Sequence, residues 1–474
     1  MYDIAIIGGG VVGALTARRL SAYKLTICVL EKENDAAAGV SKANSAIVHA
    51  GFDAEPGTLK ARLNVRGSQL FKELASELNV KYRQNGSLVV GFNESDRLAL
   101  GELYGRGIKN GVPGMELLDG KELRRREPAV SEAAVCALYA PSGAITCPYE
   151  LTIAALGNAM DNGAEFIRNF EVKRICDAGE YFEISSPGKT VKARFLVNAA
   201  GLYSDSVAAL AGAADFKIHP RRGEYMLLDK ACGEIVSHTI FGVPQKSGKG
   251  VLVTPTVDGN ILLGPTSEET DDKCDTSTTA EGLQKVRESA SRLVKNIPFG
   301  KVITSFCGIR AAGNTGDFII NAPRRRFINA AGIESPGLSA SPAIAEYIEG
   351  LLKKQGLKLE KNPDFNPARP SAHRFREASN EEKNWLIAKC PSYGKIICRC
   401  EGISEGEITD AIRTNPGARD LDGIKRRTRA QMGRCQGGFC TPSIMEILSR
   451  ELGIPYEEIT KSGEGSRLAA EVLK

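Results

Sequence analysis

Residues 4–20 of the chain read IAIIGGGVVGALTARRL, and this stretch decides the fold. Residues 4–7 form an apolar run that is typical of a strand buried on both faces. Gly8, Gly10 and Gly13 follow with the spacing G-x-G-x-x-G and open an amphipathic helical segment. The first glycine permits a tight turn, the second lets the backbone approach a pyrophosphate, and the third lets the helix pack closely on the strand. The stretch therefore predicts a dinucleotide cradle whose helix N-terminus faces the phosphates.

A second apolar run, at residues 25–30, ends at Glu31. A carboxylate here can accept hydrogen bonds from both ribose hydroxyl groups, and its charge disfavours the 2′-phosphate of NADP. FAD and NAD both use such a cradle. Two later segments, residues 195–205 and 327–342, favour FAD because each contains a buried strand, a glycine turn and the start of a helix. We expect the second of these helices to begin at Pro342, with its N-terminus facing the pyrimidine edge of a flavin.

The chain has 474 residues, of which 42% are hydrophobic, and its formal net charge is +5. This length implies more than one domain, and the hydrophobic fraction excludes a wholly disordered chain. The small net charge disfavours a general nucleic-acid or membrane-surface binder. No apolar run reaches the roughly 18 residues of a membrane span, and the N-terminus lacks the features of a signal peptide. We therefore expect a cytoplasmic protein that contacts a membrane only through a partner subunit.

Three segments carry a resemblance to a known family: the cradle, residues 41–51 (SKANSAIVHAG) and residues 197–201 (VNAAG). Together they resemble the D-amino-acid oxidase-like flavoproteins. Within that group, residues 1–355 resemble the FAD-dependent glycerol-3-phosphate dehydrogenases and oxidases, with the L-2-hydroxyglutarate dehydrogenases near them. The resemblance implies an α/β Rossmann-like FAD-binding domain interleaved with an α+β substrate domain. Residues 1–358 would form this unit, with the FAD domain at about 1–80, 145–215 and 300–358 and the substrate domain at about 81–144 and 216–299.

The resemblance also implies positions along the cofactor. Ser41, Asn44 and Ser45 would lie along the FAD, and the backbone of Val172 would contact the adenine. The full expected FAD-binding set is Gly8, Gly10, Val12, Gly13, Glu31, Lys32, Ser41, Asn44, Ser45, Val172, Ala199, Gly201, Gly332, Gly337, Leu338 and Ser339.

Four histidines leave few candidates for acid–base work. Oxidation of a secondary alcohol requires loss of the hydroxyl proton while the carbon gives a hydride to flavin N5. Imidazole is a base with a suitable pKa for this task. His49 lies in a loop of small residues directly after the serine and asparagine expected at the flavin, so we expect it to be catalytic together with Arg310. His219, His238 and His373 lack such a context and are interpreted as structural or exposed.

An anionic substrate needs cationic anchors, and a guanidinium can bind phosphate or carboxylate through two hydrogen bonds. Arg310 follows a strand-like run and precedes a turn of small residues that could deliver it to the pocket. A role as surface charge stays the alternative for Arg310 and for Lys249. By the resemblance, the substrate-binding set is Lys249, Arg310, Ser339, Arg222 and Tyr225, with Arg221 and Arg222 as the weaker candidates.

Near the C-terminus, Cys398, Cys400, Cys435 and Cys440 form the pattern C-x-C, thirty-four residues, C-x-x-x-x-C. A capping box at Ser404 and an N-cap at Thr441 predict helix starts beside the thiols. Four thiolates next to helix N-termini suit an iron–sulfur cluster, whose negative charge the N–H groups stabilise. Structural zinc, which prefers C-x-x-C knuckles, is the less favoured alternative. This segment, residues 393–460, is similar to the bacterioferritin-associated ferredoxin-like 2Fe–2S domains, which implies a small, mainly helical domain.

Proline-rich residues 359–392 predict a linker, and residues 461–474 a C-terminal tail. An FAD domain followed by this 2Fe–2S domain resembles the large flavoprotein subunit of anaerobic glycerol-3-phosphate dehydrogenases. The resemblance implies oxidation of sn-glycerol 3-phosphate to dihydroxyacetone phosphate, with electrons passing through the cluster to a second flavoprotein or iron–sulfur subunit. Five basic residues before the third cysteine are interpreted as balancing the charge of the cluster and guiding this partner, not as binding nucleic acid. They are Lys425, Arg426, Arg427, Arg429 and Arg434.

Two other functions stay open on the sequence. One is oxidation of a 2-hydroxy acid, such as L-2-hydroxyglutarate, or of an amino acid by a related flavoenzyme, because the residues do not separate phosphate from carboxylate anchoring. The other is a non-catalytic electron-transfer module in which FAD only relays electrons.

Overall fold

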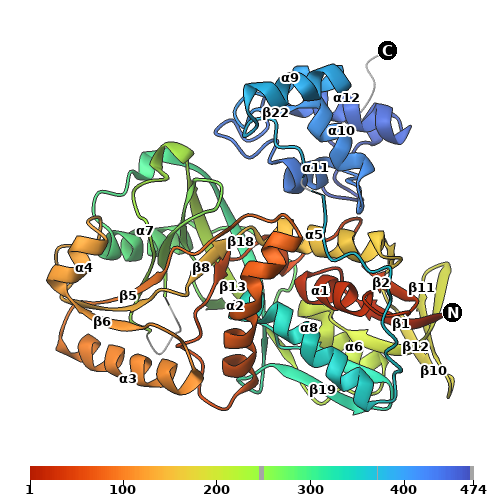
Figure 1. Ribbon diagram of the computed structural model, residues 1–474, viewed down its shortest axis with the longest axis horizontal. Coiled ribbons are helices and arrows are strands. Elements are labelled where there is room, and N and C mark those ends of the chain that lie inside the picture. Colours follow the sequence, from red (N-terminus) through yellow and green to blue (C-terminus); the bar gives the residue numbers. More distant parts are fainter. Residues whose placement is uncertain (245–249, 371, 470–474) are drawn as a thin grey trace.

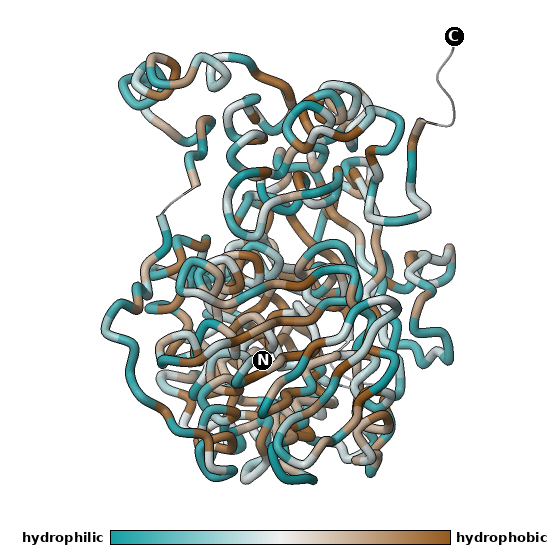
Figure 2. Tube along the Cα trace, turned by 90° about the vertical axis from the view of Figure 1, so that its right-hand side faces the viewer, coloured by the Kyte–Doolittle hydropathy of each residue, from teal (hydrophilic) through white to brown (hydrophobic). Residues whose placement is uncertain are grey.

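The computed structural model describes residues 1–244, 250–370 and 372–469. Its larger part contains two sheets that lie side by side, and a smaller, mainly helical part lies against one edge of it (Figure 1). Hydrophobic stretches concentrate inside the larger part, where the strands run, while hydrophilic stretches cover its outside (Figure 2). In the described part of the chain, no helix is both long and apolar enough to cross a membrane.

The predicted cradle lies at the centre of an eight-stranded sheet with the strand order β10-β11-β12-β1-β2-β9, in which β20 pairs with β12 and with β19. Strand β1 (Tyr2–Ile7) pairs in parallel with β2 (Ile27–Leu30) and with β12 (Lys189–Asn198). Residues 4–7 are buried, as predicted. This Rossmann-like arrangement confirms the expected α/β class. The other strands are β9 (Glu165–Ile167), β10 (Arg174–Asp177), β11 (Phe182–Ser186), β19 (Ile319–Arg324) and β20 (Phe327–Ala331).

Helices cover both faces of this sheet. Alternate residues of β1 point to opposite faces, so Ile4 and Ile6 lie on one face of the sheet and Ala5 and Ile7 on the other. The first face carries α1 (Val11–Leu20), α2 (Leu59–Glu77), α5 (Pro148–Asp161) and α8 (Gly337–Lys354), and the second carries α6 (Ser204–Leu210).

Helix α8 begins earlier than the sequence predicts. It begins at Gly337, so Pro342 lies inside the helix and not at its start. Proline has no N–H to donate to the carbonyl four residues before it. The hydroxyl of Ser341 instead donates to the Leu338 carbonyl at 2.7 Å, which satisfies that acceptor. The helix N-terminus therefore lies at residues 336–338, next to the cradle.

The second sheet has nine strands in the order β17-β13-β16-β15-β14-β5-β7-β6, with β18 paired to β13. Its two long strands, β13 (Ile218–Leu228) and β18 (Val302–Gly313), are antiparallel and run toward the first sheet. Helix α7 (Ala280–Leu293) packs on one face of the sheet. The other strands of this sheet are β5 (Ser87–Gly91), β6 (Glu116–Asp119), β7 (Cys136–Ala140), β14 (Thr239–Gly242), β15 (Leu252–Pro255), β16 (Ile261–Gly264) and β17 (Glu268–Glu269). The outer helices are α3 (Glu94–Asn110) and α4 (Gly120–Arg126). A small separate sheet contains β3 (Ile47–Val48), β4 (Tyr82–Arg83) and β8 (Ala144–Thr146).

The C-terminal part has its own hydrophobic core. Ser404 and Glu407 form the predicted capping box at the start of α10. At the second predicted start, Cys440 and not Thr441 occupies the N-cap position of α12, without a capping hydrogen bond from its side chain. The expected linker contains a helix, α9 (Asn380–Lys389). The remaining elements are β21 (Ile396–Cys398), β22 (Ile403–Ser404), α10 (Glu405–Arg413), α11 (Leu421–Thr428) and α12 (Thr441–Leu452).

Candidate active site and metal centre

A cavity of about 760 Å³ extends from the cradle to the second sheet. Its walls come from the β1–α1 turn, the end of β2, the turn after β12, the first turn of α8, and strands β13 and β18. Most of the expected FAD-binding residues therefore meet at one place although they are distant in sequence. Those that line the cavity are Gly8, Gly10, Val12, Glu31, Lys32, Ser41, Asn44, Ser45, Ala199, Gly201, Gly337 and Leu338.

The three glycines of the cradle have the separate tasks that their spacing predicts. Gly8 has a φ of +114°, and a Cβ there would collide with the Ala199 carbonyl. A Cβ at Gly13 would collide with the Gly8 carbonyl, so Gly13 serves helix packing and not the cavity wall. A Cβ at Gly10 would stand 3.3 Å from the Ser41 hydroxyl and would fill the space in front of the first turn of α1. The backbone thus leaves room for a pyrophosphate at the helix N-terminus, and the residues fit FAD.

Glu31 closes the other side of the cradle. Its carboxylate accepts hydrogen bonds from the backbone N–H of Gly9 at 2.6 Å and of Glu33 at 3.0 Å. Burial raises the pKa of Glu31, and these two N–H groups offset part of that effect. The side chain lines the cavity at the end of β2, where a ribose would be held.

Two expected cofactor residues support the cavity without lining it. Val172 packs in a core cluster after Phe170, whose N–H donates to the Glu31 carbonyl at 2.8 Å. Gly332 has a φ of +61° in the turn after β20, and its Cα lies 3.3 Å from the Cβ position of Gly313. Both residues therefore pack next to the cavity and are not part of its lining.

His49 lines the cavity beside the first turn of α8. Its Nε2 lies 3.4 Å from the Ser335 hydroxyl, and its ring centroid lies 5.9 Å from that of Phe241. Its backbone N–H donates to the hydroxyl of Ser339 at 2.7 Å. Ser339 is fully buried, and its hydroxyl also lies 3.3 Å from the Ile47 carbonyl. The structure therefore places Ser339 beneath the His49 loop and outside the cavity wall.

Two guanidinium groups line the substrate end of the cavity. Arg221 of β13 and Arg310 of β18 are register partners on adjacent strands. Arg310 donates to the Thr266 carbonyl at 2.7 Å and to the Ser267 hydroxyl at 3.2 Å. Arg221 forms a longer ion pair, at 3.7 Å, with the exposed carboxylate of Glu269. Both cations are thus positioned by the sheet to meet an anion.

Tyr225 lies on the same face of β13 as Arg221. Its hydroxyl is 3.2 Å from that of Ser45, and its ring stacks on Phe306 with centroids 4.7 Å apart. Burial raises the pKa of Tyr225, although the nearby charge of Arg310 opposes the shift. The phenol is therefore a neutral hydrogen-bonding group in the cavity wall.

Arg222 points away from this wall. Its guanidinium donates to Asp275 at 2.9 Å and to the Ser277 carbonyl at 2.6 Å, so it ties β13 to the 275–277 loop. Side chains alternate along a strand, so Arg221 and Tyr225 share one face and Arg222 the other. That alternation was available in the sequence and would have ranked Arg221 first. Lys249, the other expected anchor, lies outside the described residues.

The four C-terminal cysteines form two thiol pairs. The sulfurs of Cys400 and Cys435 are 3.5 Å apart. Cys398 is hydrogen bonded to Cys440, and both are buried. This contact, with the backbone N–H groups of Gln431 and Glu401, lowers the pKa of Cys398 to about 6.

Two pairs suit a binuclear cluster better than a single ion. Two thiolates about 2.3 Å from a tetrahedral metal are about 3.8 Å apart, close to the spacing of Cys400 and Cys435. Within residues 1–244, 250–370 and 372–469, no three His, Cys, Asp or Glu side chains converge on one metal position. The two pairs of donors fit a 2Fe–2S cluster, which takes two cysteines on each iron. A Cβ at Gly433 would collide with Cys400, which explains a glycine there.

Comparison with known proteins agrees with both sites. The family model for FAD dependent oxidoreductases matches residues 3–351, and that for the BFD-like [2Fe-2S] binding domain matches residues 396–450. The chain therefore belongs to the FAD-dependent oxidoreductase family and carries a 2Fe–2S domain of the BFD type. It is 48% identical to glycerol 3-phosphate dehydrogenase of Caloramator mitchellensis over 98% of each chain.

Two further relatives are less similar. The dithionite-reduced L-α-glycerophosphate oxidase of Mycoplasma pneumoniae, solved with FAD bound, is 32% identical with a TM-score of 0.73, over 78% of this chain and 98% of that one. Human mitochondrial L-2-hydroxyglutarate dehydrogenase is 34% identical over 56% of this chain and 60% of its own length. The resemblance that the sequence carries is thereby confirmed, as are FAD and a 2Fe–2S cluster as its cofactors.

Proposed function

We propose that the protein oxidises sn-glycerol 3-phosphate to dihydroxyacetone phosphate in this cavity and passes the electrons through its C-terminal cluster. The observation that carries the proposal is the presence of one imidazole and two guanidinium groups at the cavity end opposite Glu31. These are His49, Arg221 and Arg310. The 48% identity to a glycerol 3-phosphate dehydrogenase supports the choice of substrate.

His49 is the general base. The secondary alcohol loses its hydroxyl proton to the imidazole while its C–H bond breaks with both electrons, and a ketone forms. FAD, when bound, supplies the acceptor for that hydride. The short segment that holds His49 is fixed by Ser339, so the imidazole is positioned before the substrate arrives.

Arg221 and Arg310 hold the phosphate. Guanidinium groups bind phosphate oxygens through paired hydrogen bonds, and two of them match a dianion. Tyr225 adds a neutral donor between them and Ser45. We keep Lys249 as an expected further anchor.

The cofactor positions follow the same reasoning. The cradle and Ser41 hold the pyrophosphate, Glu31 the adenosine ribose, and the first turn of α8 the flavin, with Val172 near the adenine. Residues 1–80, 145–215 and 300–358 serve FAD binding, and residues 81–144 and 216–299 serve the substrate. The two separate sheets support this division except at residues 302–313, because β18 belongs to the second sheet and carries Arg310 toward the substrate.

The two cysteine pairs bind the two irons, Cys400 with Cys435 and Cys398 with Cys440. A 2Fe–2S cluster held by these cysteines would carry one electron at a time, which would allow the two electrons of the oxidation to leave singly for a partner protein. Any contact with a membrane is made through that partner. Of the five basic residues near Cys435, four form ion pairs within this chain.

A substrate panel tests the proposal. Flavin reduction is followed in single turnovers with sn-glycerol 3-phosphate, glycerol, L-2-hydroxyglutarate and L-proline. We expect glycerol 3-phosphate to react fastest, and glycerol to react slowly because it lacks the anion. L-2-hydroxyglutarate is the second candidate, because two guanidinium groups also suit a dicarboxylate. Faster reduction by L-2-hydroxyglutarate would replace the proposed substrate.

A further inference from the structure

The 2Fe–2S domain contributes to the wall of the FAD cavity. Asp420, the N-cap of α11, and Arg426, in the last turn of this helix, line this cavity together with Asn34 and Lys42 of the cradle region. Asn34 donates to the Asp420 carboxylate at 2.6 Å and so joins the two walls. Asn34 follows Glu31 closely, so the C-terminal domain closes the end of the cavity where the ADP half of FAD would lie.

Arg426 is fixed there by a buried carboxylate. Asp35 has no exposed surface and accepts from Arg426 at 2.6 Å and from two nitrogens of Arg427 at 2.7 Å each. Gly423 lets α11 come this close, because a Cβ at this position would lie 3.2 Å from the Asp35 carboxylate. Two arginines of one domain thus share one aspartate of the other.

Arg426 also has an unused donor. The residue is 7% exposed, and its Nε is buried with no hydrogen-bond partner among the described residues. Its Nη2 donates to Asp35, whereas its Nη1 makes no hydrogen bond among the described residues and is not fully buried, so Nη1 is the donor that an acceptor in the cavity can reach. Lys42, another cavity residue, has its pKa lowered by burial and by the charge of Arg426. A bound anion would relieve the mutual repulsion of these two cations.

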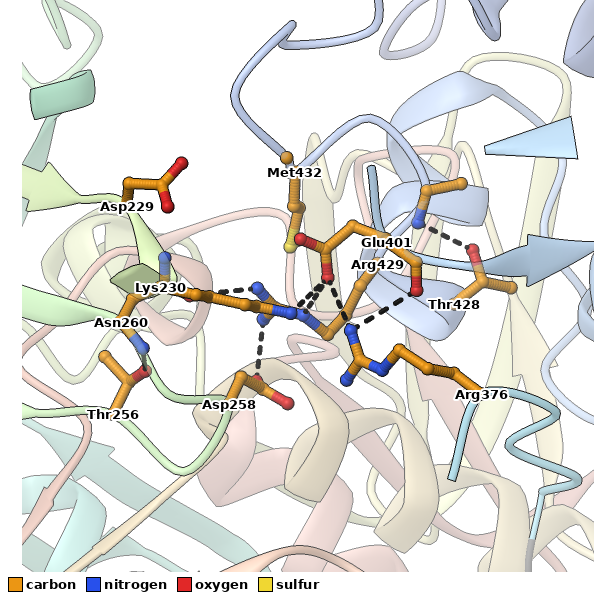
Figure 3. A network of polar contacts seen from close by, with 12 residues as sticks. Asp229, Lys230, Thr256, Asp258, Asn260, Arg376, Glu401, Thr428, Arg429 and Met432 are labelled. Atoms are coloured by element: carbon orange, nitrogen blue, oxygen red, sulfur yellow. Dashed lines mark hydrogen bonds and ion pairs between the residues drawn. The ribbon is translucent and has the colours of Figure 1, made fainter. Parts of the chain in front are cut away.

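A second polar network joins the 2Fe–2S domain to the substrate domain, away from the cavity (Figure 3). Arg429 donates to Asp258 at 2.7 Å and to Glu401 at 3.1 Å, and Glu401 also accepts from Lys230 at 2.6 Å. These four residues are absent from the described cavity lining. They provide a control, since they dock the domain without facing the cofactor.

We propose that Arg426 of the 2Fe–2S domain contacts the ADP half of FAD, so that this domain completes the FAD site. FAD binding and domain docking then stabilise each other, because the ligand bridges both walls. The inference concerns the cofactor alone and holds for any of the candidate substrates.

The test measures FAD and ADP binding to the apoprotein of three variants by calorimetry and flavin fluorescence. Arg426→Met removes the guanidinium while Arg427 still pairs with Asp35, Arg426→Lys keeps the charge, and Arg429→Met cuts the other network. Limited proteolysis in residues 359–379 reports whether the domain stays docked. We expect Arg426→Met to weaken both ligands about tenfold or more, Arg426→Lys to weaken them less, and Arg429→Met to leave them within about twofold of wild type.

Two results would overturn the inference. Wild-type affinity in Arg426→Met would show that the guanidinium does not contact the cofactor. An equal loss in Arg429→Met and Arg426→Met would show that both act only by docking the domain. If Arg426→Met does not fold, ADP binding is compared between Arg426→Lys and Arg429→Lys. An unchanged ADP affinity of Arg426→Lys would then contradict a contact between the Arg426 guanidinium and the ADP half of FAD.

Discussion

The backbone N–H of His49 donates a 2.7 Å hydrogen bond to the hydroxyl of Ser339 in the first turn of α8. The same hydroxyl lies 3.3 Å from the Ile47 carbonyl, so it holds the segment on both sides of Val48. The N-terminus of α8 lines the cavity as well. One helix therefore positions both the proposed base and the wall against which the flavin would lie.

Ser339→Ala should slow flavin reduction without changing substrate affinity. The variant leaves the His49 N–H without its acceptor, a loss of about 1 kcal/mol, and lets the imidazole move. We expect a several-fold lower limiting rate at an unchanged KM in stopped-flow measurements. Ser341→Ala is the matched control, because that hydroxyl bonds to Leu338 and should affect only the melting temperature. Equal rates for both variants would contradict a positioning role for Ser339.

His49→Asn should slow reduction of the flavin by about 10²–10⁴-fold, the usual contribution of a general base. Asparagine keeps a polar group at the position but takes no proton. The rate is measured anaerobically, with Ser335→Ala as the control for the contact at Nε2. A His49→Asn rate within threefold of wild type would remove His49 from the chemistry.

Arg221→Met and Arg222→Met should behave differently although the residues are neighbours. Arg221 faces the cavity, so its loss should raise the KM for glycerol 3-phosphate at least about tenfold, the value of a charge-assisted hydrogen bond. Arg222 binds Asp275 and Ser277, so its loss should lower the melting temperature and leave KM nearly unchanged. The reverse pattern would show that the strand presents Arg222 to the substrate.

Cys440→Ser should lose the cluster and keep the flavin. Cys440 directly precedes α12 and pairs with Cys398, and its thiol is one of the four proposed ligands. Iron and sulfide analysis and EPR spectroscopy should show the loss, while substrate still bleaches the flavin. Cys390→Ser replaces an exposed cysteine outside the two pairs and should retain both cofactors. A full iron content in Cys440→Ser would contradict the assigned pairs.

Asp35→Asn should loosen the docked domain in a pH-dependent way. Burial alone would raise the pKa of Asp35, but Arg427 and Arg426 outweigh it and hold the pKa well below its usual range. Because the folded pKa is depressed, the stabilisation is full above the unfolded pKa of about 3.9 and is lost as the pH falls through the folded value.

Removing one partner of a buried pair costs about 3–5 kcal/mol. The difference in free energy of unfolding between wild type and Asp35→Asn should therefore be constant from about pH 8 to 5 and should shrink below about pH 4. Denaturant titrations at each pH measure it. A difference that grows toward low pH would contradict the ion pair.

The cradle could be predicted from the sequence because its causes are local. Gly8 and Gly13 are required by backbone contacts within or next to the β1–α1 unit, and Glu31 follows directly from the end of β2. The predicted start of α8 at Pro342 is wrong, because Pro342 is compatible with a helix interior when the Ser341 hydroxyl donates to the Leu338 carbonyl that the proline leaves without a partner.

The ion-pair partners of the basic residues near Cys435 could not be predicted from the sequence. Their spacing suggested a surface for a partner, but Arg426 and Arg427 pair with Asp35, and Arg429 pairs with Asp258. Those carboxylates are far away in sequence, and only the packing of the domains brings them together. The same holds for Arg221, whose role depends on its register with Arg310.

The most direct test of the account is an anaerobic titration of the purified protein with sn-glycerol 3-phosphate, followed by absorption and EPR spectroscopy. If the protein oxidises glycerol 3-phosphate and passes the electrons to its cluster, the oxidised flavin bands bleach and the signal of the reduced cluster grows with them. Flavin and cluster signals that stay unchanged at saturating glycerol 3-phosphate would contradict it.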